Sequence, residues 1–403
     1  VGWIIAALTG LFIALCLAIG LSVSKPALER LQSKLLTIQA GTERMKKAKA
    51  PLSPEEWDEL REWAPKLVAA LNEGNVDFLK TSVDEDGITD RVFDPLPKEL
   101  FFQQARRGFR SSVEGLRALD GLRSPGTASI RLLTVTERDH LPALRVRHLI
   151  DGGVNYYDLL VMRFEEGFKI VDIYNFLFAS QMSDESRSAI SMLAAQQDDS
   201  FLTSFLHLPG ADSQKLLQDY TGLTDELGQG RPQQAADRYR ALPADQQALR
   251  PFFILYLQAL QSLDLSDPGI AAELSAAIER APSVLGQEGA GSLLKLDLKY
   301  YQEDWDGVLE TLHEIEASVG KDAYLHVMRG NLHLSQNRPG LAWEEARSAE
   351  ALEPGLIDLA DLKFSLFASS GKFQELIREL EAFEKRMNVK LTADDFSAPI
   401  FAD

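Results

Sequence analysis

Cysteine is almost absent from this chain, which has a single cysteine, Cys16, among 403 residues. One thiol excludes an internal disulfide, and the rest of the chain has no thiolate ligand for a structural zinc ion. Motifs with a direct chemical meaning are lacking too: there is no phosphate-binding glycine loop, no HExxH and no GxSxG. The six histidines and the carboxylates form no cluster at metal-ligand spacing. We therefore expect no metal and no cofactor, and these absences argue against an enzyme.

Positive charge is scarce as well. The chain has 42 Lys and Arg against 60 Asp and Glu, a formal net charge of -18 at pH 7. This excess of acid opposes a general affinity for nucleic acid. Hydrophobic residues make up 45% of the chain and charged residues 25%, which is typical of a globular protein with enough apolar material for two cores.

Charge is missing altogether from the first 24 residues, VGWIIAALTGLFIALCLAIGLSVS. As a helix this run would reach about 36 Å, enough to cross a bilayer core of roughly 30 Å. A signal peptide is the alternative, but no basic region precedes the run and no cleavage site is evident before Lys25. We therefore expect a transmembrane helix over 1–24. Small residues at every fourth position predict a ridge that packs against another transmembrane helix: Gly2, Ala6, Gly10, Ala14 and Ala18.

The predicted span is followed by a basic segment. Seven Lys and Arg lie within 25 residues after it, and none precedes it. The positive-inside bias therefore favours a cytoplasmic body slightly over an extracytoplasmic one, although the lack of cysteine in that body argues the other way. We expect residues 25–52 to form a stalk or linker.

A mixed α+β domain is predicted over 53–182. Ser53-Pro54-Glu55-Glu56 is a strong helix start, and Gly74 ends that helix. Two further helices are expected, followed by four strands in an antiparallel meander whose last two hairpins have three-residue connections that end in glycine, at 151–153 and 165–167. The expected ranges are 76–81 and 98–119 for the helices, and 128–137, 143–150, 154–164 and 168–177 for the strands.

This order of elements, with a last strand reading GFKIVDIYNFL, resembles the nuclear transport factor two-like family of cone-shaped α+β domains. The resemblance implies a pocket between sheet and helices. The three-residue connections place Val146 opposite Asp158 and Leu160 opposite Asp172, so that a possible pocket on one sheet face contains His148, Tyr156, Asp158, Asp172 and Tyr174. This group could be a general acid and base, a satisfied buried cluster, or a set of solvent-facing residues if the other face of the sheet is the buried one. The alternate strand positions, with Arg145, Arg147, Arg163 and Lys169, are expected to face solvent, and the alternative is a docking surface for an acidic partner.

The chain after this domain has a helical period throughout. A connecting helix is expected within 183–212 and helical repeats over 213–390, with turns at 230–232 and 266–268. The clearest unit, 323–355, resembles a tetratricopeptide repeat, and its small packing residues and terminal proline are Gly330, Ala342, Ala346, Ala349 and Pro354. The same phase recurs one unit length before and after it. The tail, 391–403, could cap the last helix or extend into a partner.

The predicted fold class is thus a transmembrane helix, a cone-like α+β domain and an all-α tetratricopeptide-like solenoid. Solenoids of this type offer a surface to other proteins and contain no reaction centre of their own. We therefore expect a single-pass membrane-anchored scaffold or accessory subunit, whose partners are other protein subunits including a transmembrane helix, and not nucleic acid. The alternative is a small-ligand-binding or enzymatic α+β domain that uses the pocket around His148, Asp158 and Asp172.

Overall fold

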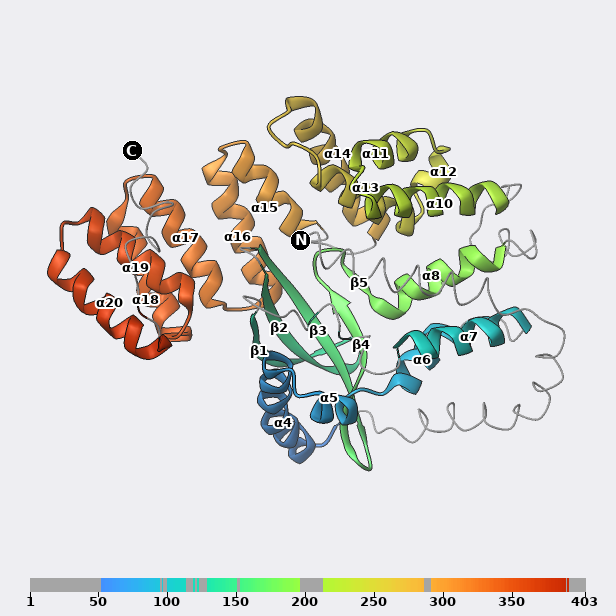
Figure 1. Ribbon diagram of the computed structural model, residues 1–403, viewed down its shortest axis with the longest axis horizontal. Coiled ribbons are helices and arrows are strands. Elements are labelled where there is room, and N and C mark those ends of the chain that lie inside the picture. The colour runs from blue at the N-terminus through green and yellow to red at the C-terminus, as the bar shows by residue number, and fades with distance from the viewer. Residues whose placement is uncertain are drawn as a thin grey trace. The chain divides into compact units, whose positions relative to one another are not determined.

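The computed structural model describes residues 52–94, 96, 100–113, 119, 122, 129–150, 153–195, 213–285, 291–388 and 390. The fold is mixed α+β, with a five-stranded antiparallel sheet and many helices (Figure 1). The chain divides into two compact units, Val1–Tyr301 and Gln302–Asp403. This division lies inside the region predicted as repeats and not at either end of the predicted connecting helix.

The transmembrane part of the predicted fold class needs correction. In the portion of the chain that the structure describes, no helix is both long enough and apolar enough to cross a membrane. Residues 1–24, with the predicted ridge of Gly2, Ala6, Gly10, Ala14 and Ala18, lie outside that portion, as does the predicted stalk up to position 51. The single-pass membrane localisation and the transmembrane partner helix are therefore not retained.

The first described helix, α4 (Pro54–Glu73), begins and ends where the sequence predicts. Ser53 accepts a hydrogen bond from the Glu56 N–H, and the Glu56 carboxylate accepts one from the Ser53 N–H at 2.9 Å. Gly74 ends the helix in the left-handed conformation, with φ of 66°. The apolar face of α4, including Leu60 and Leu67, is buried and packs against strand β1.

Three shorter helices follow: α5 (Val76–Ser82), α6 (Glu85–Phe93) and α7 (Leu100–Val113). The sequence does not predict helix α6, and α7 lies within the predicted helix over 98–119, whose remaining residues fall almost entirely outside the described part of the chain. The acidic segment around α6 hides a short apolar face formed by Ile88, Val92 and Phe93, and Thr89 and Asp90 are buried beside it. Arg106 on α7 donates a hydrogen bond to Asp90, yet burial raises the pKa of that carboxyl to about 6.

The sheet is the predicted antiparallel meander, with strands in the order β1-β2-β3-β4-β5. Its strands are β1 (Ser129–Arg138), β2 (Leu141–Ile150), β3 (Gly153–Phe164), β4 (Gly167–Asn175) and the two-residue β5 (Ser180–Gln181). The register between β2 and β3 is one residue away from the prediction. Ile150 pairs with Gly153, so Val146 lies opposite Tyr157 and not Asp158. The three-residue connections were wrong because Gly153 and Gly167 are paired strand residues.

The two faces of the sheet follow from this register. Residues on one face, among them Leu144, Val146 and Leu159, belong to a large core that also contains the apolar faces of α4 to α7. The other face contains a small cluster made of Ala143, Leu160, Met162, Phe164 and Val171. An irregularity between Leu160 and Val161 restores the predicted pairing of Leu160 with Asp172.

Helices complete the first unit. They are α8 (Met182–Ala195), α10 (Ser213–Gly228), α11 (Pro232–Arg240), α12 (Ala244–Gln247), α13 (Arg250–Gln261), α14 (Pro268–Leu285) and α15 (Ser292–Tyr301). The turns between α10 and α11 and between α13 and α14 fall at the predicted positions. Buried residues of α10, α11, α13, α14 and α15 belong to the same core cluster as the helix-covered face of the sheet.

The second unit consists of α16 (Trp305–Val319), α17 (Ala323–Ser335), α18 (Pro339–Leu352), α19 (Ile357–Ser369) and α20 (Phe373–Met387). The interval from the start of α16 to the start of α18 recurs from α18 to α20 and from α17 to α19, and we call it one repeat. The turn before each of α16, α18 and α20 has a left-handed residue at the same interval, Glu303, Asn337 and Gly371, with φ of 53°, 56° and 65°. Both the described helices and these turns of the second unit are therefore periodic.

Candidate functional site

The sheet separates the residues of the predicted pocket. His148 pairs with Asn155, so it lies on the helix-covered face with Tyr157. Asp158 pairs with Arg145 in β2 and with Tyr174 in β4, so it lies on the opposite face with Tyr156 and Tyr174. The one-residue difference in register has this effect because neighbouring strand residues point to opposite sides. His148 and Asp158 are therefore not an acid and base pair.

His148 is a buried, neutral imidazole. It is fully buried, and neither ring nitrogen has a hydrogen-bond partner among the described residues. Its described ring neighbour is Tyr157, with ring centroids 6.1 Å apart. Burial lowers the pKa of His148 to about 4, so the ring is uncharged at neutral pH.

Asp158 is held by two arginines on the other face. Arg138 Nε lies 2.6 Å from one carboxylate oxygen, and Arg145 contacts both oxygens, at 2.8 and 3.0 Å. The Arg138 guanidinium also lies over the Tyr174 ring, 3.7 Å from its centroid. Tyr156 is buried and packs edge-on against Phe176. The carboxylate is fully buried, and this arrangement stabilises its charge.

The four basic residues predicted to face solvent are at most partly exposed. The side chains of Arg145, Arg163 and Lys169 retain 13%, 26% and 15% of their accessible surface. Arg147 is almost fully buried, at 1%. The expectation of a solvated basic face was wrong because Arg145 contacts the buried Asp158 carboxylate and Arg163 contacts Glu59 on α4, at 3.1 Å.

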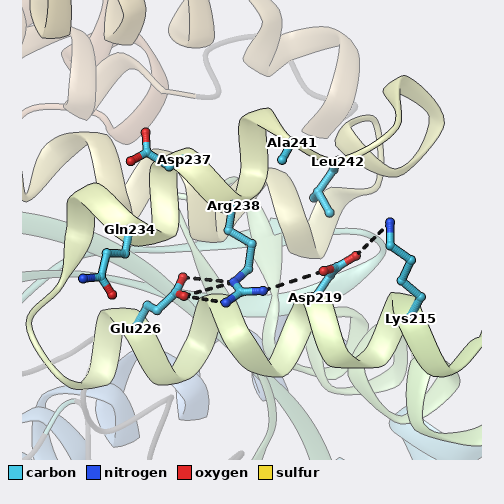
Figure 2. Close-up of a pocket in the computed structure, with 8 residues that line it drawn as sticks. All are labelled: Lys215, Asp219, Glu226, Gln234, Asp237, Arg238, Ala241 and Leu242. Atoms are coloured by element: carbon cyan, nitrogen blue, oxygen red, sulfur yellow. Dashed lines mark hydrogen bonds and ion pairs between the residues drawn. The ribbon is translucent and has the colours of Figure 1, made fainter.

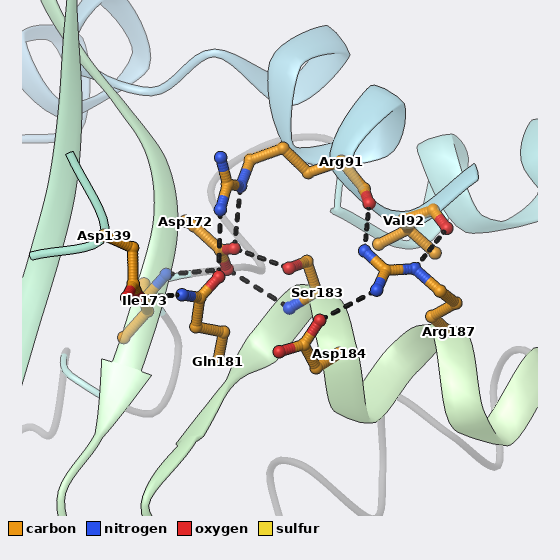
Figure 3. Close-up of polar contacts among 9 residues, drawn as sticks. All are labelled: Arg91, Val92, Asp139, Asp172, Ile173, Gln181, Ser183, Asp184 and Arg187. Carbon is orange, nitrogen blue, oxygen red and sulfur yellow. Dashed lines mark hydrogen bonds and ion pairs between the residues drawn. The ribbon is translucent and has the colours of Figure 1, made fainter. Parts of the chain in front are cut away.

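Asp172 connects three elements (Figure 3). Its carboxylate accepts hydrogen bonds from Arg91 Nε on α6 at 2.9 Å and from the Ser183 hydroxyl at 2.6 Å. It also accepts the N–H groups of Ser183, at the start of α8, and of Ile173. Arg187 on α8 donates in turn to the carbonyl oxygens of α6. Asp172 is fully buried and fully hydrogen-bonded, so its arrangement is that of a structural carboxylate.

A buried polar group that the sequence did not indicate lies near β5. Glu185 on α8 accepts a hydrogen bond from the Ser180 hydroxyl, and burial raises the pKa of its carboxyl. Arg250, the first residue of α13, donates to the Ala179 carbonyl oxygen at 2.5 Å. These contacts join the sheet end to the first helices of the predicted repeats.

A shallow cleft of about 480 Å³ lies between α10 and α11 (Figure 2). Arg238 crosses it and makes a bidentate contact with Glu226, with a closest distance of 2.6 Å. Asp219 lies 3.8 Å from both Arg238 and Lys215. Gly222 leaves room for this crossing, because a Cβ there would lie 2.6 Å from the Arg238 guanidinium carbon. The ionic contacts occupy the cleft and join the two helices.

A pair of matching ion bridges joins the helices of the second unit. Arg329 on α17 contacts Glu316 on α16 at 2.9 Å and Glu345 on α18 at 3.2 Å. Lys363 on α19 contacts Glu350 on α18 at 3.0 Å and Glu379 on α20 at 2.9 Å. Every member of the second bridge lies one repeat after its counterpart in the first. The repetition of this bridge is visible in the sequence, because the two acids and the cation recur at the same interval as the positions of the small packing residues.

The predicted repeat-packing residues lie at helix contacts, with one exception. A Cβ on Gly330 of α17 would come within 2.5 Å of the Leu362 Cδ2 atom of α19. The three alanines of α18 are buried: Ala342, Ala346 and Ala349. Pro354 is exposed, between α18 and α19. Gly330 and the alanines therefore allow close packing between helices, and Pro354 marks the turn that follows.

Across the described ranges, no group of three or more His, Cys, Asp or Glu side chains is arranged to hold a metal ion. No family model matches this chain, and neither a curated protein nor a solved structure matches it. The two family resemblances of the sequence therefore stay predictions.

Proposed function

We propose that this chain is a scaffold or accessory subunit of a protein complex, and that it binds its partner through the helical repeats. The observation that carries the proposal is the periodicity of the second unit. Helix bounds, left-handed turns and the two ion bridges all recur at the same interval. Repeats of this kind stack into surfaces that bind proteins, and this interval supports the resemblance to tetratricopeptide repeats.

The acid and base alternative has less support. His148 and Asp158 lie on different faces of the sheet, and Asp172 is bonded to Arg91 and Ser183. We propose a structural role for the α+β part, which packs with the first helices in one core.

Exposed apolar side chains are the expected contacts for a partner. On α18 and α19, Leu341 and Ile357 are 43% and 49% exposed. The net charge of -18 favours a partner with a basic surface, and such association weakens as salt increases.

The test is co-purification with the full chain, followed by reconstitution of the complex from purified components. Leu341→Glu and Ile357→Glu are the test variants, and Ala351→Glu, at another exposed position on α18, is the matched control. We expect the two test variants to weaken the reconstituted complex at least about tenfold while the control does not. A stoichiometric partner that binds all four proteins equally would refute binding through this surface.

A further inference from the structure

The last described helix, α20, packs one side of its apolar stripe against α19, and the described helices leave the outer edge of the stripe uncovered. Phe373 and Ile377, one turn apart, are 62% and 48% exposed. Leu376 and Leu380 are partly buried, and Phe383 is the buried residue of this helix. An apolar stripe of this extent on a helix surface indicates that something else covers it.

The equivalent surface of α18 shows what covers such a stripe inside the repeats. Trp343, one repeat before Ile377, packs edge-on against Phe367 of α19, with ring centroids 4.9 Å apart. The helix that follows α18 thus supplies an aromatic side chain to it. By the same spacing, the residue expected to cover Ile377 is Phe401, one repeat after Phe367.

The whole segment around Phe401 matches α19 in this phase. Residues 391–403, LTADDFSAPIFAD, align without gaps with 357–369, IDLADLKFSLFAS. The identical pairs are Asp361 with Asp395, Phe367 with Phe401 and Ala368 with Ala402, and apolar residues are retained where Leu362 and Leu366 become Phe396 and Ile400. Four of the five buried positions of α19 stay apolar in the tail, where Ala393, Phe396, Ala398 and Ile400 replace Leu359, Leu362, Phe364 and Leu366, and the fifth changes from Ala360 to Asp394.

We propose that residues 391–403 pack on α20 as α19 packs on α18, with Phe401 against Ile377 and with Phe396 and Ile400 beside it. The occupant of the stripe is this segment of the same chain. The proposal rests on the periodicity of the second unit and not on partner binding, so it and the proposed function can fail separately.

One residue, Pro399, prevents residues 391–403 from forming the same continuous helix as α19. Pro399 stands where α19 has Ser365, and a proline inside a helix removes a backbone hydrogen bond and clashes with the preceding turn. The residue before it, Ala398, replaces the buried Phe364. The proposal therefore concerns the positions of Phe396, Ile400 and Phe401, and not a continuous helix.

Proximity is tested by crosslinking in the full chain with Cys16→Ser. Ile377→Cys with Phe401→Cys should be bridged within one chain by a short bismaleimide. His313→Cys with Phe401→Cys is the control, because His313 is exposed on α16. We expect the first pair to crosslink at least about tenfold faster, independently of protein concentration. Crosslinks mainly between chains would show a second copy on α20, and equal rates for the two pairs would place the tail elsewhere; either result overturns the proposal.

A single substitution gives a second measurement that does not depend on engineered thiols. Phe401→Ala should speed amide exchange in α20 roughly tenfold, because a covering aromatic side chain is lost. Asp403→Ala is the control, since its counterpart Ser369 lies at the end of α19 and is exposed. Unchanged exchange in α20 for Phe401→Ala would mean that the tail does not cover this helix.

Discussion

Replacing Arg329 by Met should destabilise the second unit more than replacing Lys363 by Met. The two cations have equivalent positions in the repeat, but the Arg329 side chain is only 4% exposed and that of Lys363 is 12% exposed. Glu316 and Glu345, the acids beside Arg329, are 24% and 22% exposed. Removing one partner of a buried ion pair costs about 3–5 kcal/mol, and partial access of water to both acids reduces this to about 2 kcal/mol.

The Lys363 bridge should be weaker because Glu350 is 48% exposed and is solvated when the cation is lost. We expect about 1 kcal/mol for Lys363→Met. Amide exchange followed by mass spectrometry in the full chain measures both effects locally. At about 1.4 kcal/mol per tenfold change, Arg329→Met should speed exchange in α16 to α18 roughly 30-fold and Lys363→Met should speed it in α18 to α20 about fivefold.

A control that also removes the two acids separates electrostatics from packing. Adding Glu316→Gln and Glu345→Gln to Arg329→Met removes the two acids that have lost this cation, of which Glu345 still contacts His326 Nδ1 at 2.6 Å, and should recover most of the lost protection. Equal effects of the two Met variants, or no recovery in the triple variant, would refute this account of the bridges.

Further substitutions test separate contacts. Gly330→Ala should destabilise the second unit by about 1–2 kcal/mol in denaturant unfolding, since its Cβ would displace Leu362, whereas Gly340→Ala, with nothing within 4 Å, should not. Gly222→Ala should displace Arg238 and cost about 1 kcal/mol, and Gly228→Ala, also in open space, serves as its control; equal stabilities would contradict the packing. His148→Phe should remove a pH dependence of the free energy of unfolding. The pKa of His148 is about 4 in the folded chain and 6.5 in the unfolded chain, so the wild type loses on the order of 3 kcal/mol of stability as the pH falls from 6.5 to 4. Above pH 6.5 the difference in stability between variant and wild type should not depend on pH.

The sequence predicted elements that have strong local signals. The capping box at Ser53 and the left-handed Gly74 determine both ends of α4, because these residues satisfy backbone groups at the helix ends. The turn at Gly230 was likewise visible, since its φ of 67° favours glycine. The strand order followed from short connections between alternating segments.

The predicted pocket was wrong because local sequence does not show where the β2–β3 connection ends and strand β3 begins. Gly153 could end a loop or begin a strand, and only its pairing with Ile150 decides between them. That single residue moves Asp158 to the other face from His148. Helix α6 was missed for a related reason, because Thr89 and Asp90 are polar residues whose burial depends on the packing around them.

The single hydrophobic core of the first unit restricts which insertions and deletions this part of the chain can accept in evolution. Buried residues of α10, α11, α13, α14 and α15 share one core with the sheet and α4 to α7, so deleting any of these helices exposes apolar residues of the others. After Tyr301 the helices recur at a constant interval, and equivalent contacts recur with them. A duplication or loss of one whole repeat there preserves those contacts, whereas the same event before Tyr301 does not. Length variation among descendants of this chain should therefore concentrate in the second unit, in steps of one repeat.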